Sequence, residues 1–398
     1  MSTTASVPVI PPATAAGPLR YGALVAVMLL SFLLVTAEFL PNGVLTEMAE
    51  SLGVTPGQAG QTVTVTALIG FIAAPTIGLI FPRLDRRTLL VVMAAAAGLS
   101  GVLAGLAPNL ALVLVSRFLL GAAISAFWAM SITVAERIVG PERIGRAVMF
   151  TSAGVSLATV AGVPIGVMLS EVLDWRAVFV LVGVLTAVLA IPLRALLPSV
   201  PAAKASSIRI LVDTVRRPGV GLGLAGHVLV VLGHFLAYTY IRLALERMPD
   251  AEPGAIVALL ALFGVGGLLG NLVIGLIVDR TFALFSVVAP VSIAVMVGAV
   301  VLLPGSIVAL GAAVLVWGFF FASWLIVANT WVGHRMPDRL EAGGALVVTG
   351  FQGGIALAAG VGGLIVDGLG VVAADLLGAL LLLVGAALFG ASNRIKRG

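Results

Sequence analysis

The chain has no cysteine and few charged residues, and both shortages limit what it can be. Without cysteine it has no disulfides and no thiolate metal site. Only 10% of its 398 residues are charged and 61% are hydrophobic, whereas charged residues make up about 25% of an average soluble domain. So little charge cannot cover a surface that faces water, and the mean hydropathy is +1.21. We therefore expect the lipid bilayer to be the solvent for most of this chain.

The sequence also lacks the patterns of an enzyme or of a nucleic-acid-binding protein. It shows no nucleophile with an adjacent base, no glycine-rich phosphate loop and no set of metal ligands. The net charge is +5, but the basic residues are scattered through short loops and form no long run. Membrane topology explains such scatter. We expect no enzymatic activity, no cofactor, no metal and no nucleic-acid partner.

Long apolar runs are abundant, and they form two groups of six. A helix needs about 20 apolar residues to cross the hydrocarbon core. The predicted spans are 22–45, 59–82, 88–107, 110–135, 147–170, 176–197, 219–243, 254–278, 284–303, 306–332, 343–366 and 371–391. The sequence thus predicts an all-α membrane protein with twelve transmembrane helices in two pseudo-symmetric six-helix bundles.

The predicted segments of the chain follow from these spans. They are a disordered cytoplasmic N-terminus at 1–20, an N-terminal bundle at 21–197, a cytoplasmic linker at 198–218, a C-terminal bundle at 219–391 and a cytoplasmic tail at 392–398. The hexapeptides GLIFPR (Gly78–Arg83) and GLIVDR (Gly275–Arg280) lie almost half the chain apart. A membrane module repeated at half-length is typical of transporters.

Most of the 22 Lys and Arg residues fall in the loops on one side of these spans. Cytoplasmic loops carry the excess of Lys and Arg in membrane proteins, which places both termini and the linker in the cytoplasm. We expect a multi-pass monomer in a bacterial cytoplasmic (inner) membrane, whose partners are the lipid bilayer, a small-molecule substrate and protons.

Of the 17 acidic residues, Glu38 is the one that we place inside a span. Glu38 and Arg117 each lie about seven residues from the outer ends of their spans, or about 10 Å at 1.5 Å per residue. A charge inside the membrane costs roughly 2.5–3.5 kcal/mol and therefore needs a reason. Our hypothesis is that Glu38 carries a transported proton beside Arg117. The alternative is a static ion pair that joins two helices.

Two spans, the fourth and the seventh, have a polar stripe on one helical face. In the fourth span the stripe contains Arg117, Gly121, Ile124, Trp128 and Ser131. In the seventh span it contains His227, His234 and Tyr238, with Arg242 nearer the outer end. Both stripes suit the wall of a polar cavity, but Trp128 also suits a helix interface and Arg242 the membrane surface. A metal site is not expected, because residues seven apart are about 10 Å apart along a helix.

Three amides lie deep in the predicted spans, at Asn271, Asn329 and Gln352. Hydrogen bonding between helices accounts for such amides in most cases. Gln352 is the strongest candidate for a binding role because Gly353 and Gly354 follow it and allow close approach. The tenth span is rich in aromatic residues, most of which we expect to pack.

Several motifs resemble those of the major facilitator superfamily, and specifically its drug:proton antiporter family. They are GLIFPRLDRR (Gly78–Arg87), GLIVDR (Gly275–Arg280), SRFLLG (Ser116–Gly121), and AGVPIG (Ala161–Gly166) followed by DWRAVF (Asp174–Phe179). The resemblance covers all twelve spans and implies the major facilitator fold with proton coupling through Arg117. It implies conformational roles for Gly78, Arg83, Gly162, Pro164, Gly166, Gly275, Asp279 and Arg280. Pro82 stands where the first loop motif usually has Asp.

The AGVPIG and DWRAVF motifs resemble their counterparts in bacterial sugar and purine exporters. Further stretches resemble the family's purine ribonucleoside exporters. They are EFLP (Glu38–Pro41), AGQTVTVTA (Ala59–Ala67), FWAMS (Phe127–Ser131) and TYIR (Thr239–Arg242). This similarity implies export of nucleosides or similar solutes, with Trp128, Tyr240 and Arg242 near the substrate path. A broad drug exporter of amphenicol type shares these motifs. A sugar exporter would prefer stacking aromatics among many amides and acids, and the shortage of deep acids argues against it. A non-transporting receptor would be expected to have a soluble output domain.

Overall fold

The computed structural model describes residues 20–139, 144–201, 208–249 and 252–395. The predicted N-terminal segment 1–20 lies outside this part of the chain, apart from Arg20. So do 202–207 of the predicted linker and 396–398 of the predicted tail.

The regular structure of the described residues is helical. The first half contains α1 (Tyr21–Gly43), α2 (Leu45–Leu52), α3 (Pro56–Ile80), α4 (Arg86–Gly105), α5 (Leu110–Val139), α6 (Ile144–Leu157), the π-helical turn η2 (Ala158–Gly162), α7 (Val163–Leu173) and α8 (Trp175–Leu196). The linker and the second half contain α9 (Ile208–Val215), α10 (Val220–Tyr238), α11 (Ile241–Leu245), α12 (Pro253–Leu302), α13 (Ile307–Ala322), α14 (Trp324–Arg335), α15 (Leu340–Leu369) and α16 (Val371–Arg394).

Twelve stretches of the described residues are long and apolar enough to cross a membrane, which confirms the predicted number. Large apolar side chains on their outer surfaces are exposed, among them Leu276 at 87% and Val308 at 78%. Such a surface is stable only in lipid, because burying it from water is the main driving force for folding and association.

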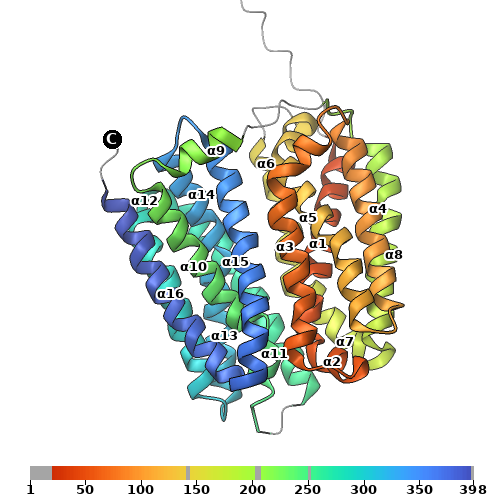
Figure 1. The fold of residues 1–398 in the computed structure, drawn as a ribbon, viewed down its shortest axis with the longest axis vertical. Coiled ribbons are helices and arrows are strands. Elements are labelled where there is room, and N and C mark those ends of the chain that lie inside the picture. Colours follow the sequence, from red (N-terminus) through yellow and green to blue (C-terminus); the bar gives the residue numbers. More distant parts are fainter. Residues whose placement is uncertain (1–19, 140–143, 202–207, 250–251, 396–398) are drawn as a thin grey trace, which may run out of the picture.

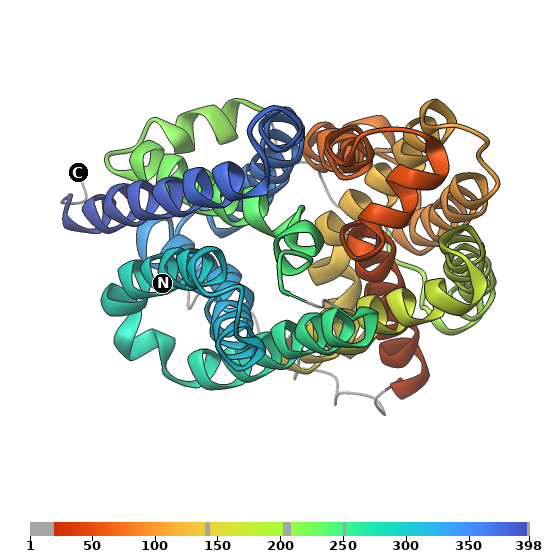
Figure 2. The same cartoon turned by 90° about the horizontal axis from the view of Figure 1, so that it is seen from below.

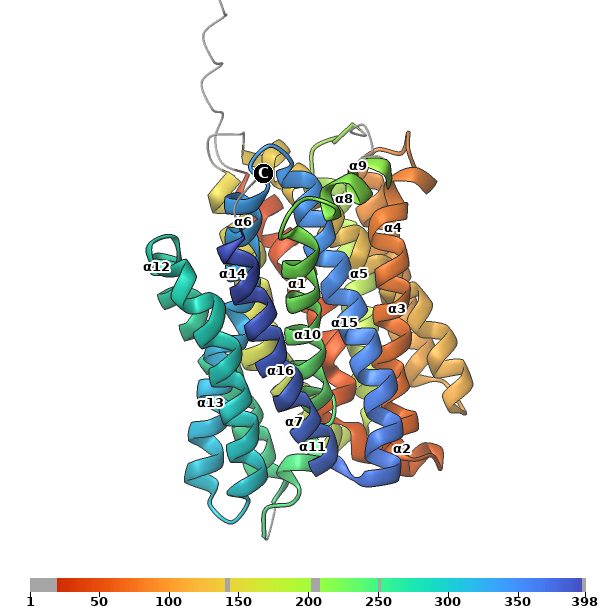
Figure 3. The same cartoon turned by 60° about the vertical axis from the view of Figure 1, so that its left-hand side comes forward.

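The two halves differ at the turn that follows their second span. In the first half α3 ends just before Phe81 and Pro82, and the Asp85 carboxylate caps α4 by accepting the Thr88 N–H at 3.2 Å. In the second half α12 runs through both spans, and its ribbon turns back on itself near the α12 label in Figure 3. No Pro or Gly interrupts 279–283, so the helical hydrogen-bond pattern continues into the turn.

Figure 1 shows two helical bundles side by side, and Figure 2 shows the same arrangement from below. We call the end near α9 the linker end and the opposite end the α2 end. In Figure 1, α3 and α15 lie close together near the α2 end and diverge toward the linker end. In the described part of the chain, hydrogen bonds and ion pairs join the two halves through residues 43–61 of the first half, at or near the α2 end.

Candidate transport site

Glu38 lies in α1 with 6% of its surface exposed, so the carboxyl group faces protein and not lipid. The helix α1 contains Pro41 near its C-terminal end. Proline has no N–H, so the carbonyl four residues earlier, on Ala37, lacks its helical donor. Arg117 supplies one: its Nη1 donates to the Ala37 oxygen at 3.2 Å. The EFLP sequence therefore fixes the guanidinium next to the residue that carries the acid.

Arg117 of α5 is 1% exposed and lies over the Phe179 ring, with 4.8 Å between the guanidinium carbon and the ring centroid. It borders a small cavity between α1, α4, α5 and α8. Within the described residues its Nε and Nη2 atoms have no hydrogen-bond partner. Glu38 and Arg117 interact through their charges, but they form no ion pair. The alternative of a static ion pair thus does not describe this structure.

Gln352 of α15 brings the second half to Glu38. Its side chain is the amide neighbour of the Glu38 carboxyl group and is also 6% exposed. Glu38 Oε1 and Gln352 Nε2 are both buried, and neither has a hydrogen-bond partner among the described residues. The predicted proton site and this predicted binding residue therefore meet at the boundary between the halves.

Part of the polar stripe predicted for the fourth span is packed against α3, and part of it is half-buried. Trp128 is half-buried and packs edge-to-face on Phe127, with ring centroids 5.2 Å apart. Ile124 is 1% exposed, and a Cβ at Gly121 would overlap the Thr66 carbonyl of α3. Arg117 and Trp128 place a charged and an aromatic group beyond this close α3–α5 contact, and the Ser131 hydroxyl donates to the Trp128 carbonyl at 3.0 Å.

The two histidines of α10 form matching hydrogen bonds with two tryptophans. Trp317 Nε1 donates to His234 Nδ1 at 2.9 Å, and Trp324 Nε1 donates to His227 Nδ1 at 3.1 Å. Indole nitrogen only donates, so each Nδ1 is an acceptor. The two histidines are seven residues apart, and so are the two tryptophans, which aligns the two hydrogen bonds along facing helices. This spacing was a signal that sequence reasoning did not use.

The two histidines differ in the partner of their other ring nitrogen, Nε2. His227 Nε2 lies 3.0 Å from the Val347 carbonyl, so this neutral ring has both nitrogens satisfied. His234 Nε2 is buried without a partner in the described part of the chain. His234 stacks on Tyr238, with centroids 5.2 Å apart, and this cluster reaches Phe39 of the first half. His234 therefore retains a free N–H beside an aromatic surface at the boundary of the halves.

Tyr240 and Arg242, both predicted near the substrate path, join the halves at the α2 end. The Tyr240 hydroxyl donates to the Ala359 carbonyl at 2.8 Å, and its ring occupies the space where Gly60 has no side chain. Arg242 Nη2 pairs with Glu47 of α2 at 2.6 Å, and its Nε pairs with Glu246 at 2.7 Å.

Further polar contacts complete this junction. Arg242 Nη1 donates to the Gly43 carbonyl at 2.7 Å, and Thr46 Oγ1 donates to Glu246 at 3.0 Å. We call Thr46, Glu47, Arg242 and Glu246 the α2-end interlock. Beside it, Asp367 of α15 accepts the Gly57 N–H at 2.9 Å, at the positive end of the α3 dipole.

The conformational residues implied by resemblance lie in two places. Gly162 and Gly166 are contact points for α1: a Cβ at Gly162 would overlap Thr36 Oγ1, and one at Gly166 would come 2.5 Å from Leu40. Pro164 follows η2, where the wider π-helical turn accommodates the missing N–H. This span thus packs tightly against the helix that carries Glu38.

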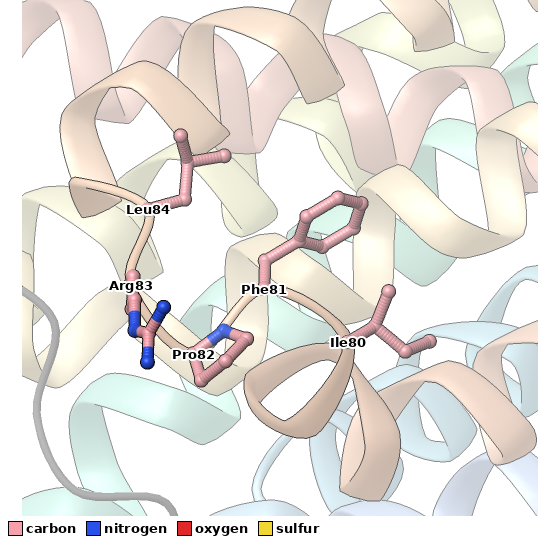
Figure 4. Close-up of a pocket in the computed structure, with 5 residues that line it drawn as sticks. All are labelled: Ile80, Phe81, Pro82, Arg83 and Leu84. Atoms are coloured by element: carbon pink, nitrogen blue, oxygen red, sulfur yellow. The ribbon is translucent and has the colours of Figure 1, made fainter.

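The loop motifs lie at the linker end. Arg83, Gly275 and Arg280 are exposed, whereas the burial of Gly78 and Asp279 lies outside what the structure describes. Figure 4 shows the hollow formed by Ile80, Phe81, Pro82, Arg83 and Leu84.

Position 82 has no acid, and in this loop Asp85 supplies the carboxylate that accepts hydrogen bonds. Its Oδ2 accepts the Ser199 hydroxyl at 2.6 Å and the Val200 N–H at 2.8 Å. Partial burial raises the pKa of the Asp85 carboxyl, but the hydrogen bonds from Ser199, Thr88 and Val200 outweigh it and lower the pKa below its usual range.

Two buried polar residues were missed. Asp375 of α16 is 2% exposed, near Arg247, so the expectation that Glu38 is the one acid inside a span is wrong. Its position within the predicted span 371–391 was the available signal. Asn42 is 2% exposed, and neither polar atom of its amide has a partner among the described residues. It lies four residues after Glu38, on the same helical face.

Comparison with known proteins decides the family. The model of the Major Facilitator Superfamily matches residues 27–344. The chain belongs to this superfamily. It is therefore a membrane transporter and not an enzyme, and the predicted superfamily and fold are confirmed.

Individual proteins are similar to this chain over almost its whole length. The purine ribonucleoside efflux pump NepI of Escherichia coli (strain K12) is 32% identical over 366 residues, or 92% of each chain. A protein named transcription regulatory protein OpdE, of Pseudomonas aeruginosa, is 32% identical over 375 residues, also 92% of each chain.

Solved structures share the fold. The nucleoside transporter NupG, solved as a point mutant, has a TM-score of 0.78 at 14% identity and covers 94% of this chain and 100% of its own. A bacterial homolog of the human lysosomal transporter Spinster has a TM-score of 0.68 at 15% identity, covering 95% and 98%.

Proposed function

We propose that this chain is a proton-coupled antiporter that exports small organic solutes across the cytoplasmic membrane, purine nucleosides or similar compounds in the first place. The observation that carries the proposal is Glu38: a buried carboxyl group, free of an ion pair, next to an amide from the opposite half. A carboxyl group placed there changes its surroundings when the halves move. Proton binding can then favour one conformation over the other, which coupling requires.

The proposed cycle is alternating access between the two bundles. With the linker end in the cytoplasm, as the Lys and Arg pattern favours, the α2 end faces outward. The interlock of Thr46, Glu47, Arg242 and Glu246 closes that end in this conformation, which is then inward-facing. Inward movement of a proton through Glu38 drives substrate outward, and the protein works as a monomer.

Nucleosides fit the chemistry of the second half. A purine is planar and carries hydrogen-bond acceptors, which matches the aromatic cluster and the free His234 Nε2–H. Trp128, Tyr238 and Gln352 are the other proposed contacts. Tyr240 and Arg242 act at the closed end of the path. The names of NepI and NupG, a nucleoside efflux pump and a nucleoside transporter, support the same class.

A broad-specificity drug exporter of amphenicol type is the second candidate, because the cluster around His234 is largely apolar and stacks any flat ring. A sugar exporter fits less well, since sugars are bound through many polar side chains. Flux into proteoliposomes under an imposed pH gradient separates these classes, with labelled inosine, chloramphenicol and arabinose as the panel. Accumulation of inosine supports the proposal. Flux of every compound that does not depend on the gradient contradicts proton coupling. Absence of flux for all three compounds contradicts the proposed substrates and favours a regulatory role like that in the name of OpdE.

A further inference from the structure

The middle of α3 has a notch at Gly70 that is filled from the other half of the protein. A Cβ at this position would overlap Gln352 Nε2, lie 3.3 Å from Gln352 Cδ and lie 2.9 Å from Ser125 Oγ. Glycine inside a helix costs roughly 0.5–1 kcal/mol relative to alanine. Here the missing side chain admits the Gln352 amide between α3 and α5.

The hydrogen bonds around the notch leave the amide available. The Ser125 hydroxyl donates to the Gly70 carbonyl at 2.9 Å, so its proton is already used. Gln352 Nε2 is buried without a partner in the described chain, and so is Glu38 Oε1 beside it. Among the described residues, Arg117 is the charged group whose field reaches Glu38. The amide is therefore the group of the second half that faces the carboxyl.

We propose that Gln352 is a positioning residue for Glu38, which reaches across the boundary between the halves through the notch at Gly70. An amide N–H that faces a carboxylate stabilises its negative charge. Because this amide belongs to the opposite half, its effect on Glu38 depends on how the halves are arranged. The inference rests on the proposed role of Glu38 and names the element that ties its proton affinity to the conformation.

Three variants separate this role from simple packing. Gly70→Ala closes the notch and displaces the amide, but it leaves Gln352 and Glu38 chemically intact. Gln352→Leu removes the amide and keeps a similar volume. Gly353→Ala is the matched control, because its new methyl group meets only the Phe71 ring, at 3.2 Å, across the same boundary.

The test is an infrared pH titration of the protonated-carboxyl band, recorded on the full chain in lipid without substrate. The band of Glu38 is identified by its loss in Glu38→Gln. An amide N–H that faces a carboxylate favours its charged form, so removing it should shift the titration midpoint toward higher pH, by about one pH unit. We expect this shift in Gly70→Ala and Gln352→Leu, and the wild-type midpoint in Gly353→Ala.

Each outcome decides a different point. If Glu38→Gln removes the band but both Gly70→Ala and Gln352→Leu titrate like the wild type, the positioning role is wrong and the proton site stands. A shift of the same size in Gly353→Ala also overturns it, because packing alone then explains the effect. If Glu38→Gln removes no titrating band, Glu38 binds no proton in this range, and the proposed function falls together with this inference.

Discussion

A substitution in the α2-end interlock should shift the equilibrium between the two conformations. Arg242 and Glu246 belong to the same half, so their ion pair is unaffected by rocking of the halves. The pair of Arg242 and Glu47 crosses between the halves, with 2.6 Å between nitrogen and oxygen. Glu47→Gln therefore removes one charge from the closed state and leaves the rest of the interlock in place.

The size of the effect follows from the surroundings of this pair. The Arg242 side chain is 7% exposed and that of Glu47 is 33% exposed. A hydrogen bond to a charged group contributes about 1.5–3 kcal/mol when buried, and an exposed ion pair about 0–1 kcal/mol. We expect this half-buried pair to contribute about 1–2 kcal/mol, which changes the ratio of the two conformations by a factor of about 5–30.

Distance measurements between spin labels test this prediction, and the absence of cysteine makes labelling simple. Leu106 and Leu369 lie at the α2 end in opposite halves, and they are 70% and 76% exposed. With labels at Leu106→Cys and Leu369→Cys, the wild type should show mainly the short distance. Glu47→Gln should increase the long-distance population about 5–30-fold, within the range estimated above. Glu50→Gln, at an exposed site on the same helix, is the control. Equal distance distributions in Glu47→Gln and the control would refute the reasoning.

Three further predictions concern single contacts. Gly162→Ala should destabilise the protein by about 1–3 kcal/mol, because the new methyl group overlaps Thr36 Oγ1; thermal unfolding in detergent measures this. Trp324→Phe leaves the buried His227 Nδ1 without its donor and should cost about 1–3 kcal/mol in the same assay. At the linker end, hydrogen bonds from Arg217 lower the pKa of Asp338 to about 2. This contact therefore stabilises the fold above about pH 4, and the contribution is lost as the pH falls toward 2. Asp338→Asn should remove that pH dependence from thermal unfolding curves.

The sequence predicted the number of spans well because each must supply a continuous apolar run of a length set by the bilayer. It could not show that Arg117 donates to the Ala37 carbonyl, although Pro41 leaves that carbonyl free. The partners of His227 and His234 could have been found, since Trp317 and Trp324 repeat the same spacing of seven. The continuous helix through both spans of α12 and the notch at Gly70 depend on how distant segments meet. No local pattern encodes such contacts.

Proton coupling through Glu38 is the central claim, and the Glu38→Gln variant tests it most directly. The full chain is reconstituted in proteoliposomes, and transport of the labelled substrate that the wild type carries is compared with and without a pH gradient. The account predicts that Glu38→Gln loses gradient-driven accumulation and keeps substrate exchange across the membrane. Gradient-driven accumulation at the wild-type rate in Glu38→Gln would contradict it.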